Sequence, residues 1–117
     1  WDLTDILLQK REQNVPMGFV IPRSGALVLN EGIAIVNGAP HRAEAERFYE
    51  FVTTKKALLH QAERFYRIPA RRDISDQEKP GWLRSIQITE LPVDWNVINA
   101  HREAWMQYWD QHIKGHH

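Results

Sequence analysis

The chain has 117 residues, 43% of them hydrophobic, which is enough for one domain with a core of its own. Fifteen basic residues balance fifteen acidic ones and are scattered along the chain, which argues against a nucleic-acid partner. Cysteine is absent, so disulfides and thiolate metal sites are excluded, and no apolar run is long enough to span a bilayer.

The first element expected along the chain is a short helix over residues 3–13, where apolar side chains recur at helical spacing. Pro16 and Gly18 interrupt that pattern. Three short apolar segments typical of β-strands follow, at residues 19–21, 26–29 and 33–36. Since these strands are too few to close a sheet, they indicate one part of a larger α/β layer.

A polar break, Asn30-Glu31-Gly32, separates the second and third of these apolar segments. A bulge or a hairpin turn explains it structurally, because Asn and Gly accommodate the backbone of a tight connection. Alternatively, the break directs Asn30 and Glu31 into a cleft, where they accept hydrogen bonds from a ligand. The residues by themselves leave both interpretations open.

The rest of the chain predicts three helices and one long connection. The helices are expected at about residues 42–53, 55–66 and 94–113. The last of them starts at a capping residue, Asp94, and places Ile98, Trp105 and Trp109 on one side. Such a stripe is typical of a core, with a stacking platform for a sugar or a base as the alternative. Residues 67–81 form a polar connection, either an ordered surface crossing or a flexible loop.

Motifs that carry chemistry are missing from the sequence. The six histidines follow no metal-ligand spacing, and His116-His117 resemble a purification tag. Ser24 lies outside the frame of a nucleophile elbow, no glycine-rich phosphate loop is present, and paired carboxylates fall where solvation explains them. We therefore expect no catalytic residue, no metal and no cofactor, and a protein that is not an enzyme.

Residues 22–52, PRSGALVLNEGIAIVNGAPHRAEAERFYEFV, resemble the C-terminal part of the extracellular solute-binding proteins of ABC importers. The resemblance is to the type II periplasmic class, which includes iron(III), thiamine, polyamine and phosphonate binders. The residues that match the family pattern are Pro22, Gly25, Ala34, Ile35, Gly38, Ala39, Ala45, Phe48, Phe51, Pro69, Arg71 and Asp73. The tail D-W-x-x-I-x-x-x-R-x-x-W-x-x-x-W, residues 94–109, is similar to the family's closing helix.

The resemblance implies an α/β fold: a partial lobe of a type II periplasmic binding protein, with short strands and three or four helices. Residues 1–117 would be the C-terminal segment of a two-lobed protein, with hinge-return strands at 19–36 and ligand enclosed between the lobes. Trp1 stands where an initiator Met is expected, which also favours a piece of a longer polypeptide.

The implied function is that of the substrate-binding component of an ABC transporter. It captures a small-molecule or metal-ion solute in the cleft and delivers it to a membrane permease. The implied location is periplasmic or extracellular, including a cell-surface lipoprotein. In the polyamine branch a Trp and an acidic residue contact the ligand, and their positions correspond to Leu29 and Glu31. Glu31 is thus the leading ligand-binding candidate, with Asn30, Ser24 and the Gly25 backbone as further polar contacts.

Two other classes of function compete with solute binding. An enzyme on the same fold is disfavoured because no acid–base or nucleophile set is present. A stand-alone interaction module would dock a partner through the Trp-rich final helix, and large exposed apolar patches would favour it. An unpaired strand edge would also lead copies of the chain to self-associate.

Overall fold

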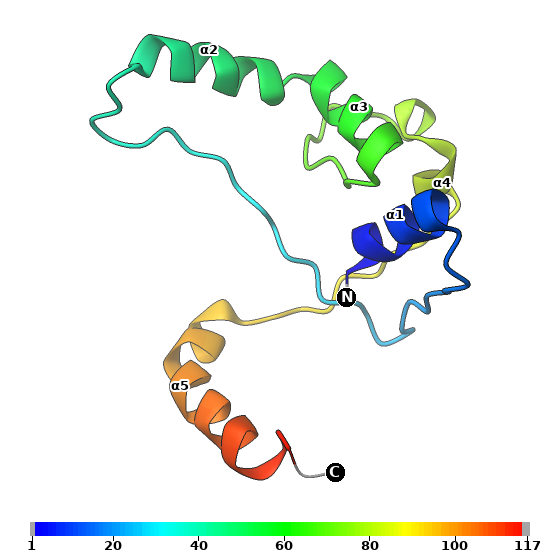
Figure 1. Ribbon diagram of the computed structural model, residues 1–117, viewed down its shortest axis with the longest axis vertical. Coiled ribbons are helices and arrows are strands. Elements are labelled where there is room, and N and C mark those ends of the chain that lie inside the picture. The colour runs from blue at the N-terminus through cyan, green and yellow to red at the C-terminus, as the bar shows by residue number, and fades with distance from the viewer. Residues whose placement is uncertain (1, 116–117) are drawn as a thin grey trace.

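The computed structural model describes residues 2–115 and consists of helices joined by extended segments (Figure 1). The interpretations that concern Trp1 and His116-His117 lie outside the described residues. The elements are α1 (Leu3–Gln13), α2 (Arg42–Val52), α3 (Lys55–Phe65), a 3-10 turn η1 (Asp76–Glu78), α4 (Gly81–Arg84) and α5 (Trp95–His112). The helices expected from the sequence are confirmed to within about two residues at their ends, whereas η1 falls in the expected polar connection and no helix was expected at α4.

The predicted α/β fold, a partial lobe of a type II periplasmic binding protein, is wrong for this chain. Helices account for 51% of the structure and strands for 2%, and no sheet forms among the described residues. The segments expected as strands, at 19–21, 26–29 and 33–36, are extended, but a single parallel bridge between Ala26 and Glu90 is their only pairing there. An apolar strand pattern needs a neighbouring strand to satisfy its backbone, and the described chain supplies only that one bridge.

The helix ends are set by capping residues that can be recognised in the sequence. The carboxylate of Asp2 accepts a 2.9 Å hydrogen bond from the first turn of α1, and the hydroxyl of Thr54 caps α3 at 3.2 Å. The expected cap Asp94 accepts a 2.9 Å bond from the first turn of α5. Helices α1 and α3 end in left-handed residues, Asn14 and Tyr66.

The core is small and lies where α1, α3 and α4 meet. The buried apolar side chains are Ala62, Ile74 and Leu83. The indole Nε1 of Trp82 donates a 2.9 Å hydrogen bond to the carbonyl of Ala62, and the ring of Tyr66 contacts Trp82 edge-on at 5.3 Å. Thr4 of α1 donates a hydrogen bond to the carbonyl of Tyr66. These contacts join the three helices into one packed unit.

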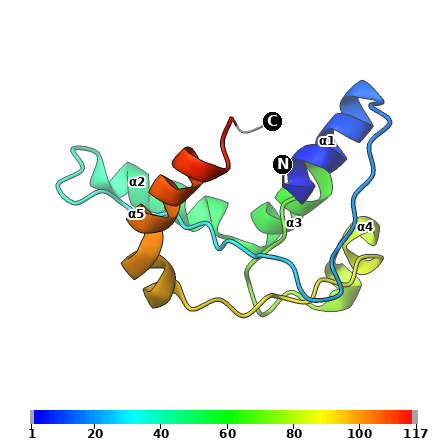
Figure 2. The ribbon, with the colours of Figure 1, turned by 90° about the horizontal axis from the view of Figure 1, so that it is seen from below.

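Helices α2 and α5 extend away from this unit, so the molecule is open (Figures 1 and 2). Its Cα radius of gyration is 18.4 Å, against about 13 Å for a compact domain of this length. Its accessible surface is 10139 Å², against about 6,600 Å² for a folded monomer of this mass. None of the helices within residues 2–115 has the length and apolar character that crossing a membrane requires.

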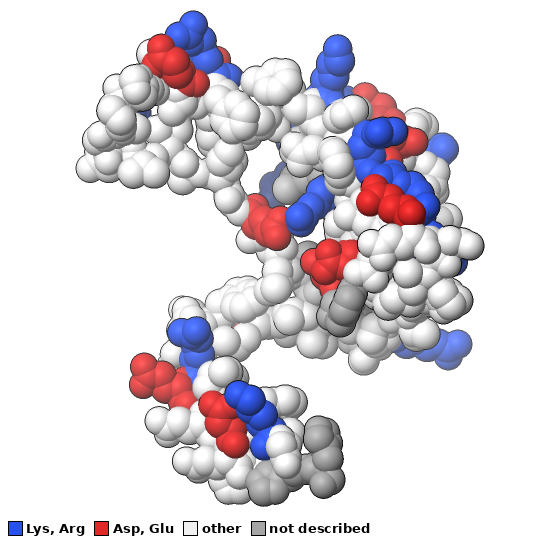
Figure 3. Space-filling model, viewed as in Figure 1, with Lys and Arg blue, Asp and Glu red and all other residues white. Residues whose placement is uncertain are grey.

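Much of the exposed surface is apolar. The largest uncovered side chains outside the packed unit include Val20, Leu27, Leu29, Val36, Phe48, Phe51, Trp105, Met106 and Trp109. The expectation that the Trp-rich stripe belongs to the core is therefore wrong for the described chain, because Trp105 and Trp109 remain 52% and 51% exposed and α5 has no buried residue. Figure 3 shows broad uncharged areas between interspersed acidic and basic groups.

Candidate functional site

The candidate site begins at the turn formed by residues 22–25. The amide of Gly25 donates a 3.1 Å hydrogen bond to the carbonyl of Pro22, and Gly25 has a φ of 112°. A Cβ on Gly25 would lie 3.0 Å from the Cα of Leu91, so only glycine permits this approach. Two backbone hydrogen bonds, of 2.8 and 2.9 Å, then join Ala26 to residues 89–91. Gly25 is thus buried and structural, and it fixes where the extended segment starts.

The extended segment carries the predicted ligand residues away from this turn. Leu29 and Asn30 line an open hollow of about 350 Å³ together with Trp95 at the start of α5. That volume is at the lower end of the range for small-molecule sites. Ser24 lies at the other end of the segment, exposed in the turn, so the structure does not bring it to the hollow.

Glu31 is the next residue after Asn30 in the sequence, and it forms an ion pair with Arg67. The Nη1 of Arg67 donates a 2.9 Å hydrogen bond to Oε2 of Glu31, and the Glu31 side chain remains 77% exposed. Arg67 comes just after α3, so this contact ties the extended segment to the helical unit. An exposed pair of this kind contributes about 0–1 kcal/mol, which leaves the carboxylate accessible to a competing cation.

Two residues of this site were missed by sequence reasoning. Trp95 belongs to a helix whose aromatic residues were assigned to a core, and Arg67 to a polar connection. The basic cluster at residues 64–72 was a signal for an arginine near α3, but nothing in it indicated contact with Glu31. The resemblance places an aromatic residue at position 29, where this chain has leucine. In the structure, the aromatic ring of the hollow comes from Trp95 instead.

The loop after α3 is an ordered crossing, held by charged hydrogen bonds. Arg71 donates two 2.8 Å hydrogen bonds to the carboxylate of Asp73 and a third, of 3.1 Å, to the carbonyl of Thr53. The paired guanidinium lowers the pKa of Asp73 to about 2. Hydrogen bonds from Lys55, at 2.6 Å, and from Ser75 likewise lower the pKa of Glu78 to about 2. The motif residues Arg71 and Asp73 thus fasten the loop to the α2–α3 junction.

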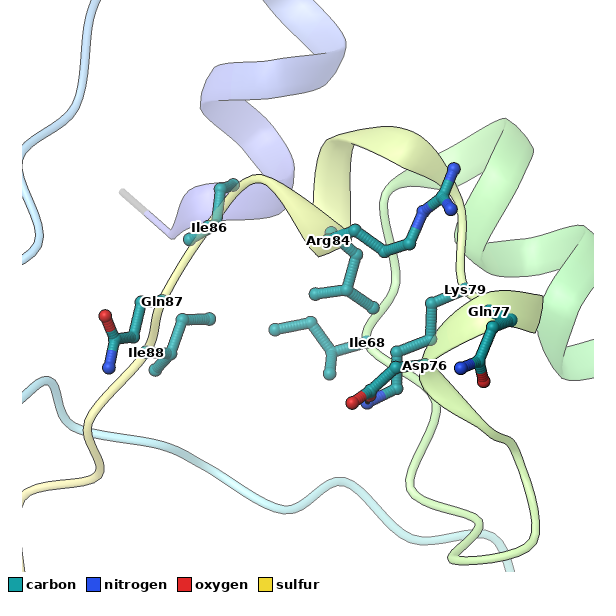
Figure 4. A pocket seen from close by; sticks show the side chains of 9 residues that line it. Ile68, Asp76, Gln77, Lys79, Arg84, Ile86, Gln87 and Ile88 are labelled. Atoms are coloured by element: carbon teal, nitrogen blue, oxygen red, sulfur yellow. Dashed lines mark hydrogen bonds and ion pairs between the residues drawn. The ribbon is translucent and has the colours of Figure 1, made fainter.

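A second hollow, of about 600 Å³, lies between this loop and the segment after α4. Its lining residues are Ile68, Asp76, Gln77, Lys79, Leu83, Arg84, Ile86, Gln87 and Ile88. Ile68 and Ile88 point toward each other across it (Figure 4). Asp76 is neutralised by Lys79 at 2.6 Å, which lowers the pKa of that carboxyl. Because Asp76 is paired, the interior of the hollow is mainly apolar. The sequence did not indicate this hollow.

Histidine and acidic side chains are the remaining candidates for chemistry in residues 2–115. No group of three histidine, cysteine or acidic side chains in that range lies close enough together to hold a metal ion. The described histidines, at positions 41, 60, 101 and 112, are exposed. No protein-family model matches the chain, and comparisons with curated proteins and with solved structures give no match. The resemblance to solute-binding proteins therefore rests on the quoted sequence positions alone.

Proposed function

We propose that the chain takes part in solute capture for an ABC importer, in the periplasm or at the cell surface, with residues 29–31 facing the solute. One observation carries the proposal. Leu29 and Asn30, selected from sequence, line a hollow of small-molecule size, and the Glu31 carboxylate follows at the next position. Delivery to a membrane permease completes the proposed function.

The chemistry of the hollow suits a solute with a cationic group. Trp95 offers an aromatic face for a cation–π contact, and Asn30 offers both a hydrogen-bond donor and an acceptor. Glu31 supplies the opposite charge. Its partner Arg67 must be displaced by the solute, and the cost is small because the ion pair is exposed.

Capture with useful affinity requires a further polypeptide surface. The hollow is open, and Leu27, Ile33 and Val36 of the same extended segment remain 57%, 49% and 74% exposed. Binding sites usually enclose most of a ligand, so this chain by itself leaves a solute largely in contact with water. We therefore expect millimolar affinity from the chain alone and tighter binding when a partner polypeptide covers the extended segment.

The test is an NMR titration of the chain with putrescine, using neutral 1,4-butanediol as the matched probe. The indole N–H signal of Trp95 and the side-chain amide of Asn30 should shift with putrescine and not with the diol. Glu31→Gln should abolish the shifts. Glu44→Gln, which removes an exposed carboxylate paired with Arg47 at 3.2 Å, should leave them unchanged. Equal shifts in wild type and Glu31→Gln, or none in wild type, would contradict the proposal.

A further inference from the structure

Helix α5 stands apart from the packed unit (Figures 1 and 2), and Trp105 and Trp109 on it are half exposed. Every described residue from 99 to 115 is exposed. Trp105, Met106, Trp109 and Ile113 are 52%, 54%, 51% and 45% exposed, and their helical spacing places them on the same side as Ile98. We call these five residues the aromatic face. Most of the stability of a helix in a protein comes from packing of its apolar side, so the face needs a cover.

Ring stacking orients Trp105 of the aromatic face and a second pair of rings beside the face. The His101 ring stacks on Trp105 at 5.5 Å between centroids, and the Tyr108 ring stacks on His112 at 4.4 Å. Both pairs are nearly parallel, with interplanar angles of 22° and 16°. Rings that are already oriented lose less conformational freedom when a partner covers them.

A charge within the aromatic face indicates what the partner is. Arg102 lies on this side of the helix, one turn after Ile98 and one turn before Trp105 and Met106. It forms no ion pair with any residue in 2–115. Asp110 lies one turn beyond Met106, at the edge of the face, where it pairs loosely with Lys114 at 3.3 Å. Arg102 and Asp110 are thus spaced equally on either side of Met106.

We propose that α5 pairs in antiparallel orientation with α5 of a second copy of the chain, about a two-fold axis near Met106. In this register Arg102 of each copy faces Asp110 of the other, so one symmetric contact forms two charge pairs. In each copy the five side chains of the aromatic face expose about 500 Å², mainly from the two half-exposed tryptophans. The dimer then buries about 1,000 Å² at most, the lower limit for a specific interface, which is typical of a weak, reversible dimer.

Sedimentation equilibrium of the full chain, over about 5–500 µM, tests this pairing. The wild type should be a reversible dimer with a Kd of about 10–100 µM. Arg102→Asp should raise the Kd at least about tenfold, because it places two like charges opposite each other. Arg102→Asp with Asp110→Arg should restore it, since the swapped charges again face their opposites. Lys56→Asp on α3, with the same change in charge away from the face, should have no effect.

Three results would overturn the inference: a monomer at every concentration, a dimer indifferent to Arg102→Asp, or a failure of the double variant to recover. Helix content by circular dichroism confirms that each variant retains α5. The pairing does not depend on the proposed solute site, so the two proposals fail separately. A chain that does not dimerise can still bind putrescine, and a chain that dimerises need not.

Discussion

Replacing Gly25 by alanine tests whether the turn at residues 22–25 positions the candidate site. Alanine at a φ of 112° costs about 1–3 kcal/mol in backbone strain. The new Cβ would also lie 3.0 Å from both the Cα and the amide nitrogen of Leu91, neither of which is the end of a flexible side chain. A total of about 2–4 kcal/mol is expected, and each 1.4 kcal/mol is tenfold in an equilibrium. Opening of this contact should therefore become about 30- to 700-fold more frequent.

Hydrogen exchange at the amides of Ala26 and Leu91 measures that opening, because both donate across the contact. Substitutions at two other glycines separate the effect of backbone strain from that of the close contact with Leu91. Gly38→Ala keeps the left-handed strain, at a φ of 72°, with nothing within 4 Å, and should speed exchange only in its own turn. Gly18→Ala has neither strain nor a neighbour and should change nothing. Unchanged exchange at Ala26 and Leu91 in Gly25→Ala would refute the positioning argument.

Two further predictions concern the packed unit and the loop that closes it. Trp82→Phe removes the hydrogen bond from Nε1 to the carbonyl of Ala62 and should lower the free energy of unfolding by about 1 kcal/mol, measured by urea titration. The pKa of Asp73 is lowered to about 2 by Arg71, so this carboxylate stabilises the loop above its unfolded pKa of about 3.9 and loses that effect as the pH falls toward 2. NMR titration of the Asp73 carboxyl should show this low pKa, and Arg71→Gln should return the pKa to the ordinary range. An ordinary pKa in the wild type would contradict the two hydrogen bonds from Arg71 to Asp73.

The helices were predictable because their signals are local. Asp94 and the apolar spacing after it specify the start of α5 within a few residues of chain, whatever surrounds the helix. The strands were not, because pairing is a property of two segments. The pattern at 26–29 indicates that one side of an extended chain is apolar, but it does not indicate which segment pairs with that chain.

The candidate site likewise combines residues that a local sequence pattern predicts with residues that it does not. Leu29 and Asn30 could be selected from sequence because a polar break in an apolar segment is visible within a few positions. Trp95 and Arg67 could not, since each reaches the site from a different part of the chain. Gly25 was selected for a different role from the one it has: its φ and its contact with Leu91 make it part of the support, not of the binding surface.

The exposed apolar residues fall into two sets with different periods, and this decides what can cover them. Along the extended segment, Leu27 and Leu29 are exposed while the residues between and before them are half-buried, a period of two. On α5 the period is that of a helix. A partner for the first set must offer backbone hydrogen bonds as well as apolar contact, whereas a partner for the second needs only complementary side chains. A second copy of α5 meets the second requirement and leaves the first unmet, so dimerisation by itself would not enclose the hollow beside Glu31. The proposed solute site therefore needs a different polypeptide surface from the one that pairs the helices.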